Sequence, residues 1–265
     1  MFFRISSFEL TLVLFAIVFG ATGLGIVLGH YVRHRSQHLR EPLGVLQGAL
    51  LGLVGLVLAF GLALAVGRYQ SRRDAVVADA NAIGTTYLRA QTLSEPVRTR
   101  SLGLLVRYTD TSIRLATAVP SSTKARRAIA DGQKLQRQLW GLAGQSLAGA
   151  PEASAPRLYV ETLNEMIDMQ TVRVAALNNR VPGAVLAVEV TFATVALGLL
   201  AFYLAILGRG VLPVLLAAAL IGMLLLVTFD LDRPERGLIR VPATPLTSLR
   251  ASMELPPAAA APSRP

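Results

Sequence analysis

The sequence predicts an all-α membrane protein in which four transmembrane helices form two hairpins, with a helical cytoplasmic domain inserted between helices two and three. Three observations predict this class: four long apolar runs, the absence of Lys and Arg within them, and helical periodicity in the more polar middle of the chain. The runs are Leu10–Val32, Leu43–Gly67, Val181–Gly208 and Gly210–Phe229. Each has about 20 residues or more, enough to cross a hydrocarbon core of about 30 Å.

Composition agrees with a membrane domain joined to one modest soluble module. The chain has 265 residues, 53% of them hydrophobic, and a mean hydropathy of +0.52. Its net charge of +10 would suit nucleic acid or anionic lipid headgroups. The basic residues are dispersed and not interleaved with aromatics, which favours the lipid surface and predicts no nucleic-acid partner. The chain has no cysteine, which excludes disulfides, thiolate metal sites and a cysteine nucleophile.

The runs and their connections predict the domain boundaries. Residues 1–67 form a transmembrane hairpin with helices at 10–32 and 43–67, and residues 183–229 form a second hairpin. The single charge at Arg4 and the uninterrupted run after it predict an uncleaved first helix rather than a signal peptide. Gly208 and Gly210 predict a tight turn between the last two membrane helices, with Pro213 in the first turn of the fourth. An even number of crossings and the flanking Lys and Arg place both termini in the cytoplasm.

The middle section, residues 68–182, is expected to be helical. Val76, Ala80, Ile83 and Tyr87 recur at helical spacing, and three further apolar stripes follow along the section. Breaks are expected at 94–96, 120–122 and 149–156, where Pro, Gly and Ser gather. No breaker separates helix two from the middle section, which predicts one helix from Leu43 to about Leu88. Residues 230–265 form a cytoplasmic tail, and its Pro/Ala-rich composition predicts disorder from about residue 244.

Two features of the membrane helices are candidates for function. Glu189 is the only carboxylate within the apolar runs, and an acid at that depth usually faces a cavity or a partner. It could line a pore or bind a proton, or it could be a protonated acid held between helices with Thr191 or Thr194 as neighbours. Helix two carries glycines four residues apart from Gly44, which could form a packing seam or line an oligomer axis. In the second case the candidates that face the pore are Leu56, Val57 and Phe60.

Charged clusters at the membrane ends offer two possible metal sites. The segment after helix four contains Asp230, Asp232, Arg233, Glu235 and Arg236. Three carboxylates could help to bind a divalent cation, but the interleaved arginines favour internal pairing. The three histidines of the chain stand at 30, 34 and 38, a spacing that could ligate a metal on a helix, but neighbouring arginines would repel a cation. We therefore predict no metal and no cofactor.

Several segments together carry a resemblance to a known family. They are residues 51–60, which read LGLVGLVLAF, and residues 72–89, 163–168, 180–182 and 230–240. In combination they resemble the bacterial bestrophin-like membrane proteins, a family of unknown function, and the resemblance extends to about Leu249. Through the bestrophins it implies a pentameric anion channel with four membrane helices per subunit, in the bacterial inner membrane. The arginines that interrupt the acidic cluster depart from the calcium-regulated bestrophins, and no pore residue is carried over.

These observations predict a homo-oligomeric ion channel that conducts an anion such as chloride through a pore on the symmetry axis. Basic residues at the pore mouth would raise the local anion concentration; the candidates are Arg68, Arg72, Arg73 and Arg180. Two alternatives stay open: a non-conducting scaffold or sensor whose cytoplasmic helices bind a partner protein, and a proton-coupled transporter that uses Glu189. No hydrolase, kinase or nucleotide-binding motif is present, so we do not expect an enzyme.

Overall fold

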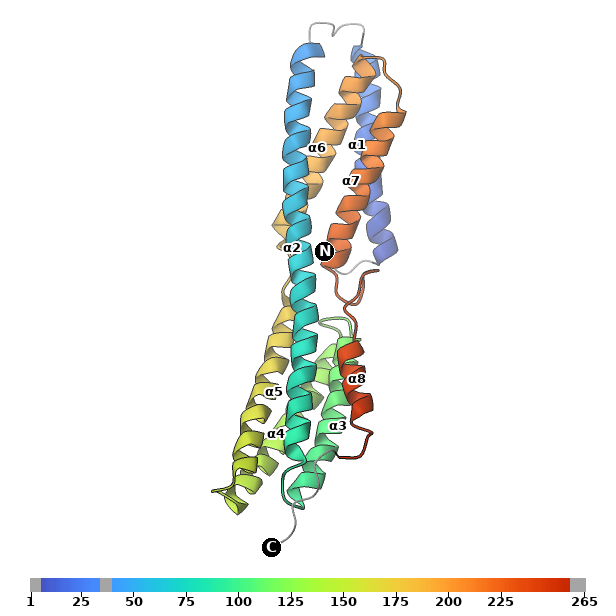
Figure 1. Ribbon diagram of the computed structural model, residues 1–265. Coiled ribbons are helices and arrows are strands. Elements are labelled where there is room, and N and C mark those ends of the chain that lie inside the picture. Colours follow the sequence, from blue (N-terminus) through green and yellow to red (C-terminus); the bar gives the residue numbers. More distant parts are fainter. Residues whose placement is uncertain (1–5, 34–39, 258–265) are drawn as a thin grey trace. The chain divides into compact units, whose positions relative to one another are not determined.

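The computed structural model describes residues 6–33 and 40–257, and every regular element in those ranges is a helix (Figure 1). The chain divides into two compact units. Unit 1 comprises Met1–Tyr69 and Arg180–Ile239, and unit 2 comprises Gln70–Asn179 and Arg240–Pro265. The prediction of an all-α fold is confirmed.

Unit 1 contains α1 (Ser7–Val32), the first part of α2 (Arg40–Ala90), α6 (Gly183–Ile206) and α7 (Leu212–Leu231). Four helical segments of the chain are long and apolar enough to cross a membrane, and each overlaps one of the four predicted runs over most of its length. In the most apolar stretch of each segment only 22% to 33% of the residues are buried, so most of these apolar side chains point outward, as expected where lipid replaces water. Buried apolar side chains fill the interior of the unit, among them Leu14, Leu186, Ala218, Leu225 and Phe229.

Close contact between α1 and α6 depends on glycine. A Cβ at Gly25 would overlap the carbonyl oxygen of Gly198, and a Cβ at Gly29 would overlap that of Phe202. Small residues let membrane helices approach until their backbones touch, which maximises dispersion contacts where the hydrophobic effect is absent. The close approach of α1 to α6 therefore depends on Gly25 and Gly29 of α1. From the sequence, the glycines of helix two were the expected packing positions.

The ends of the helices follow local sequence signals. Ser6 and Glu9 form a capping box at the start of α1: the Ser6 hydroxyl accepts from the Glu9 amide at 3.1 Å, and Glu9 accepts from the Ser6 amide at 2.7 Å. Gly208 ends α6 with a φ of +69°, a conformation that glycine adopts without a steric penalty. Pro213 lies in the first turn of α7, as predicted. Helix α2 runs unbroken from Arg40 to Ala90, which confirms the prediction of one long helix.

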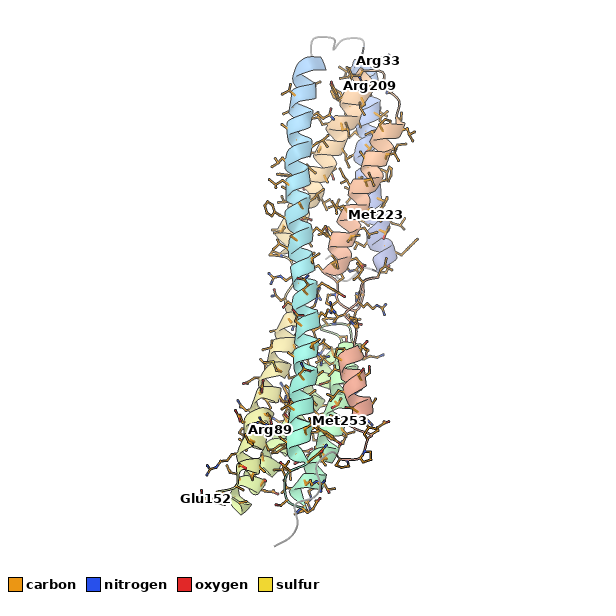
Figure 2. The ribbon with its side chains drawn as sticks, in the orientation of Figure 1. Arg33, Arg89, Glu152, Arg209, Met223 and Met253 are labelled. Carbon is orange, nitrogen blue, oxygen red and sulfur yellow. The ribbon has the colours of Figure 1, made fainter. Side chains whose placement is uncertain are left out.

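Unit 2 packs the remainder of α2 with α3 (Val97–Ala116), α4 (Thr123–Gly149), α5 (Ser154–Asn178) and α8 (Thr244–Ser252). The breaks between these helices fall where Pro, Ser and Gly predicted them. The predicted apolar stripes face one another in a shared core that includes Ile83, Leu105, Leu139, Leu163 and Met166. Met253, which is labelled in Figure 2, also belongs to this core.

The C-terminal tail differs from the prediction, because α8 forms where disorder was expected. Leu246 and Met253 are buried in the core of unit 2, and the Tyr87 hydroxyl donates to the Met253 carbonyl at 3.2 Å. Arg250 forms an ion pair with Asp110 on α3 at 2.8 Å. Leu246, Leu249 and Met253 form a short helical stripe that the surrounding Pro and Ala concealed. The end of the tail, residues 258–265, lies outside the described residues.

Candidate functional site

The proposed pore residues lie on a face of α2 that its own unit leaves open. Leu56 and Phe60 expose 54% and 64% of their surface, whereas Val57 is half-buried. On this side of the helix, Gly48 and Gly52 are also exposed, and a Cβ at either would meet nothing within 4 Å. The opposite face carries the buried residues Val54, Leu58 and Ala65. Gly48 and Gly52 therefore do not pack against another helix of the subunit, whereas a Cβ at Gly44 would lie 2.8 Å from the Tyr203 hydroxyl of α6.

Glu189 is buried in unit 1 and faces α2. It exposes 1% of its surface, and neither carboxyl oxygen has a hydrogen-bond partner in the described part of the chain. A Cβ at Gly61 would overlap the Glu189 carboxyl group, so the missing side chain at this position makes the space that Glu189 occupies. Thr191 and Thr194, the neighbours considered from sequence, donate instead to carbonyls of their own helix at 2.8 and 2.6 Å.

The four basic candidates for the pore mouth divide between the two units. Arg68 and Arg180 belong to unit 1 and are half-buried. Arg72 and Arg73 belong to unit 2, where Arg72 is buried and Arg73 is exposed. Of these four, Arg73 is the most accessible to dissolved ions. The role of the set stays a prediction.

Two carboxylates at the C-terminal end of α7 accept hydrogen bonds from backbone amides. Asp230 accepts from the amides of Leu238 and Ile239, both at 2.8 Å, and so fixes the turn that leaves the membrane helix. Asp232 accepts from the amide of Val181 at 2.9 Å, which ties the start of α6 to the end of α7. Both side chains are buried. Charged acceptors bond amides more strongly than neutral ones do, which suits them to a buried turn.

The arginines of the same cluster are part of this turn. Burial lowers the pKa of Arg233, while the negative charge of Asp230 opposes that shift. Glu235 has a φ of +62°, in the left-handed region. Within residues 6–33 and 40–257, no three His, Asp or Glu side chains converge in a way that could hold a metal ion. His34 and His38 lie outside the described residues.

A buried ion pair in unit 2 was missed by sequence reasoning. Arg173 of α5 donates to Asp79 of α2 at 2.5 Å and to the Ser112 carbonyl of α3 at 2.9 Å. Arg173 and Asp79 expose 1% and 0% of their side chains. Burial raises the pKa of Asp79, and the guanidinium of Arg173 opposes that shift. The sequence did contain a signal for this pair, because Asp79 and Arg173 are charged residues that each stand at a core-facing position of an apolar helical stripe.

Beside the ion pair, a second set of polar side chains joins three helices. The Gln136 amide of α4 donates to the Tyr108 hydroxyl of α3 at 3.1 Å and to the Gln170 oxygen of α5. Gly132 makes room for Gln170, because a Cβ there would lie 2.6 Å from its side-chain nitrogen. Buried polar groups with satisfied bonds define how helices align, since a shifted register would leave them unpaired.

Comparisons with known proteins agree with this architecture. The family model described as Bestrophin-like domain matches residues 14–246. A solved bacterial bestrophin homologue from Klebsiella pneumoniae, a tyrosine-to-alanine variant, superposes with a TM-score of 0.68 at 15% identity, covering 89% of this chain and 97% of that one. A leucine-to-threonine variant gives 0.67 at 16% identity, with 90% and 97% covered. A zinc-phased structure of the homologue gives 0.65 at 14% identity, with 89% and 97% covered. No curated protein sequence matches the chain.

Proposed function

Since the chain belongs to the bestrophin-like family, we propose that it is the subunit of a homo-oligomeric ion channel with its pore on the symmetry axis. By its resemblance to bestrophins the assembly is a pentamer in the bacterial inner membrane, with both termini in the cytoplasm. The observation that carries the proposal is the open face of α2, which combines exposed glycine with exposed Leu56 and Phe60. A face directed only at lipid has no need of small residues, whereas a face that meets another helix does.

A path for ions would have to run between copies of the chain. The interior of unit 1 is filled by apolar side chains from α1, α2, α6 and α7, including Leu58, Leu197 and Leu225. A hydrated ion cannot cross such a core without losing its water, at a cost of many kcal/mol. The open face of α2 is the surface on which a second set of side chains could line water.

Selectivity would come from an apolar constriction and a basic mouth. Leu56 and Phe60 stand one turn apart, so copies arranged around an axis would form two successive apolar rings. Narrow apolar rings gate by expelling water. Arg68 lies about two turns beyond Phe60, and it would raise the concentration of an anion such as chloride together with Arg73.

Chloride flux through liposomes that contain the purified protein tests this proposal. We expect flux from the native chain and faster flux from Phe60→Ala and Leu56→Ala, because smaller side chains leave a wider ring that expels water less readily. The matched control is Leu216→Ala on α7, since Leu216 is exposed to 56% and Leu56 to 54%. Equal effects of Leu56→Ala and Leu216→Ala on flux would show that Leu56 does not line the pore. A monomeric protein without flux would overturn the channel and leave the scaffold or sensor.

The burial of Glu189 favours a second candidate, proton-coupled transport. An ionised carboxylate without a bonding partner is costly in hydrocarbon, so a proton on Glu189 would stabilise its buried position. Loss of the proton would favour movement of the side chain from Gly61 toward water, a change that could be coupled to a substrate. Uptake driven by a pH gradient and abolished by Glu189→Gln would support this candidate. Uptake that depends neither on the pH gradient nor on Glu189 would exclude proton-coupled transport.

A further inference from the structure

A groove with basic walls runs along unit 2 between α3 and α4. Three adjoining cavities of about 560, 360 and 430 Å³ form it. Neighbouring cavities share lining residues: Arg107 and Gln138 belong to the first two, and Arg114 and Asp131 to the last two. The cavities thus follow one another along the antiparallel pair of helices.

The walls carry more positive than negative charge. Arg100, Arg107 and Arg114 repeat every seven residues along α3, which places successive guanidinium groups on one side about 10 Å apart. Helix α4 contributes four further cations: Lys124, Arg127, Lys134 and Arg137. The acidic residues of the lining are Asp110 and Asp131.

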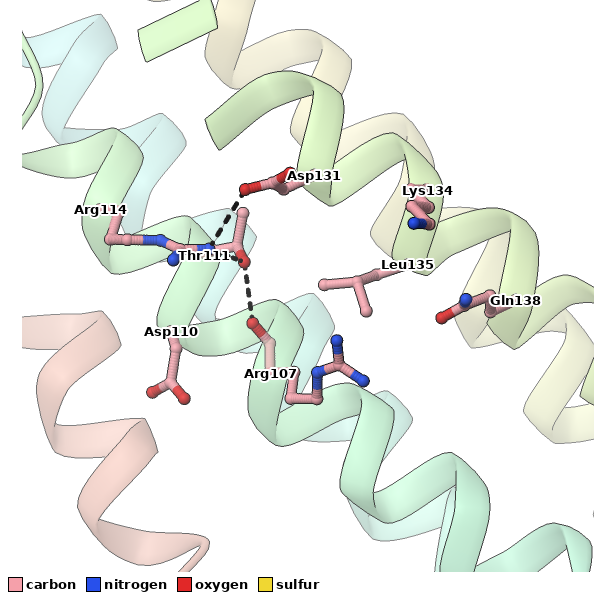
Figure 3. Close-up of a pocket in the computed structure, with 8 residues that line it drawn as sticks. All are labelled: Arg107, Asp110, Thr111, Arg114, Asp131, Lys134, Leu135 and Gln138. Carbon is pink, nitrogen blue, oxygen red and sulfur yellow. Dashed lines mark hydrogen bonds and ion pairs between the residues drawn. The ribbon is translucent and has the colours of Figure 1, made fainter. Parts of the chain in front are cut away.

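Both of those carboxylates are already paired, so the cations that remain are available to a ligand. Asp110 forms an ion pair with Arg250 of α8 at 2.8 Å, and Asp131 pairs with Arg114 at 3.6 Å. In the described part of the chain, neither Arg107 nor Lys134 uses its side chain in an ion pair or hydrogen bond. Figure 3 shows the Arg107 guanidinium extending from α3 toward the α4 wall on which Lys134 lies.

We propose that this groove binds a small anion that carries two or more phosphate groups. Arginine matches phosphate oxygens with parallel N–H donors, and lysine adds a compact point charge. Cations on both walls, with Arg100 and Arg107 about 10 Å apart on α3, favour a ligand with several linked charges over a single halide or orthophosphate. The site belongs to unit 2 and does not depend on conduction, so a result that excludes the proposed channel would leave this proposal intact.

Binding of inorganic tripolyphosphate to the full-length protein in detergent, measured by calorimetry, tests the inference. We expect saturable binding, and a loss of about tenfold in affinity for Arg107→Gln and for Lys134→Gln, because each removes one charge-assisted contact. The matched control is Arg126→Gln on the same helix as Lys134, since Arg126 already donates to the Ser121 carbonyl at 2.7 Å and lines none of the three cavities. This variant should keep the native affinity.

Three binding results would overturn the inference, and so would one result from light scattering. The first is no binding of tripolyphosphate at millimolar concentration and physiological ionic strength, and the second is equally tight binding of orthophosphate. The third is an equal loss in Arg126→Gln and Arg107→Gln, which would mean attraction to the general positive charge. Light scattering is measured alongside, because dissociation of the oligomer by Arg107→Gln would show that the groove is a contact between copies and not a ligand site.

Discussion

Replacement of Arg173 by methionine tests whether the buried ion pair holds unit 2 together. The substitution removes the bonds to the Asp79 carboxylate at 2.5 Å and to the Ser112 carbonyl at 2.9 Å, and it leaves the Asp79 side chain buried at 0% exposure. Removal of one partner from a buried pair costs about 3–5 kcal/mol. At about 1.4 kcal/mol per tenfold change, amide protons protected by α5 should exchange roughly two to four powers of ten faster.

The assay is hydrogen exchange of the full chain in detergent, read by mass spectrometry on peptides of α5. Arg157→Met is the matched control, because Arg157 stands on the same helix but pairs with Glu152 at 3.6 Å on the surface, where the two side chains are exposed to 61% and 94%. An exposed pair contributes about 0–1 kcal/mol, so this variant should exchange nearly as the native chain does. Equal protection in the two variants would refute the argument that the buried pair stabilises the unit.

Two further measurements separate the ion pair from its environment. The double variant Asp79→Leu with Arg173→Met should recover much of the lost protection, because apolar side chains of similar volume can replace a buried pair at little cost. In Arg173→Met alone, loss of the guanidinium raises the pKa of Asp79 further above its unfolded value of about 3.9. The deficit should therefore be smallest below that pH and should grow as the pH rises and the unpaired carboxyl ionises.

Two other predictions follow from buried groups in each unit. Gly61→Ala should lower the free energy of unfolding by about 1–3 kcal/mol, since the new methyl overlaps Glu189. Gly20→Ala on α1, where a Cβ would meet nothing within 4 Å, should be neutral or stabilising by up to about 1 kcal/mol. Thermal melts in detergent that rank the two variants equally would contradict the packing. Burial, reinforced by a nearby carboxylate, raises the pKa of Tyr108. Its contribution to stability should be full below the unfolded pKa of about 10 and should be lost as the pH rises through the higher native value. As the pH rises, and before the protein unfolds, the native chain should therefore show the same phenolate absorbance as the Tyr108→Phe variant. A larger phenolate absorbance from the native chain would disprove the burial of Tyr108.

The helices could be predicted well from the sequence, because the sequence signals for helices are local. Runs without Lys or Arg indicate membrane helices in any context, and Pro, Ser and Gly marked every break in unit 2. The tail shows where local composition misleads. Its Pro and Ala indicate disorder, but Leu246 and Met253 enter a core built by other helices, and burial there offsets the cost of ordering α8.

The candidate site was harder to predict, because it depends on which side of each helix is covered. Glycines of α1 and α2 look alike in sequence, yet Gly25 touches α6 and Gly52 meets nothing. The intramembrane position of Glu189 was evident from the sequence, whereas its place against Gly61 was not. The acidic residues at the end of α7 were recognised as a cluster, but the bonds of Asp230 to backbone amides depend on the turn at 237–239, and the bond of Asp232 depends on the approach of Val181.

By itself, the sequence determined the class of protein, the membrane segments, the long second helix and the family resemblance, since each follows from composition or spacing along the chain. Only the tertiary structure decided that Arg173 meets Asp79, that unit 1 leaves one face of α2 open, and that α3 and α4 together line a basic groove. Helical periodicity defines the faces of one helix, but the identity of a partner face arises when helices distant in sequence pack and exclude solvent from between them.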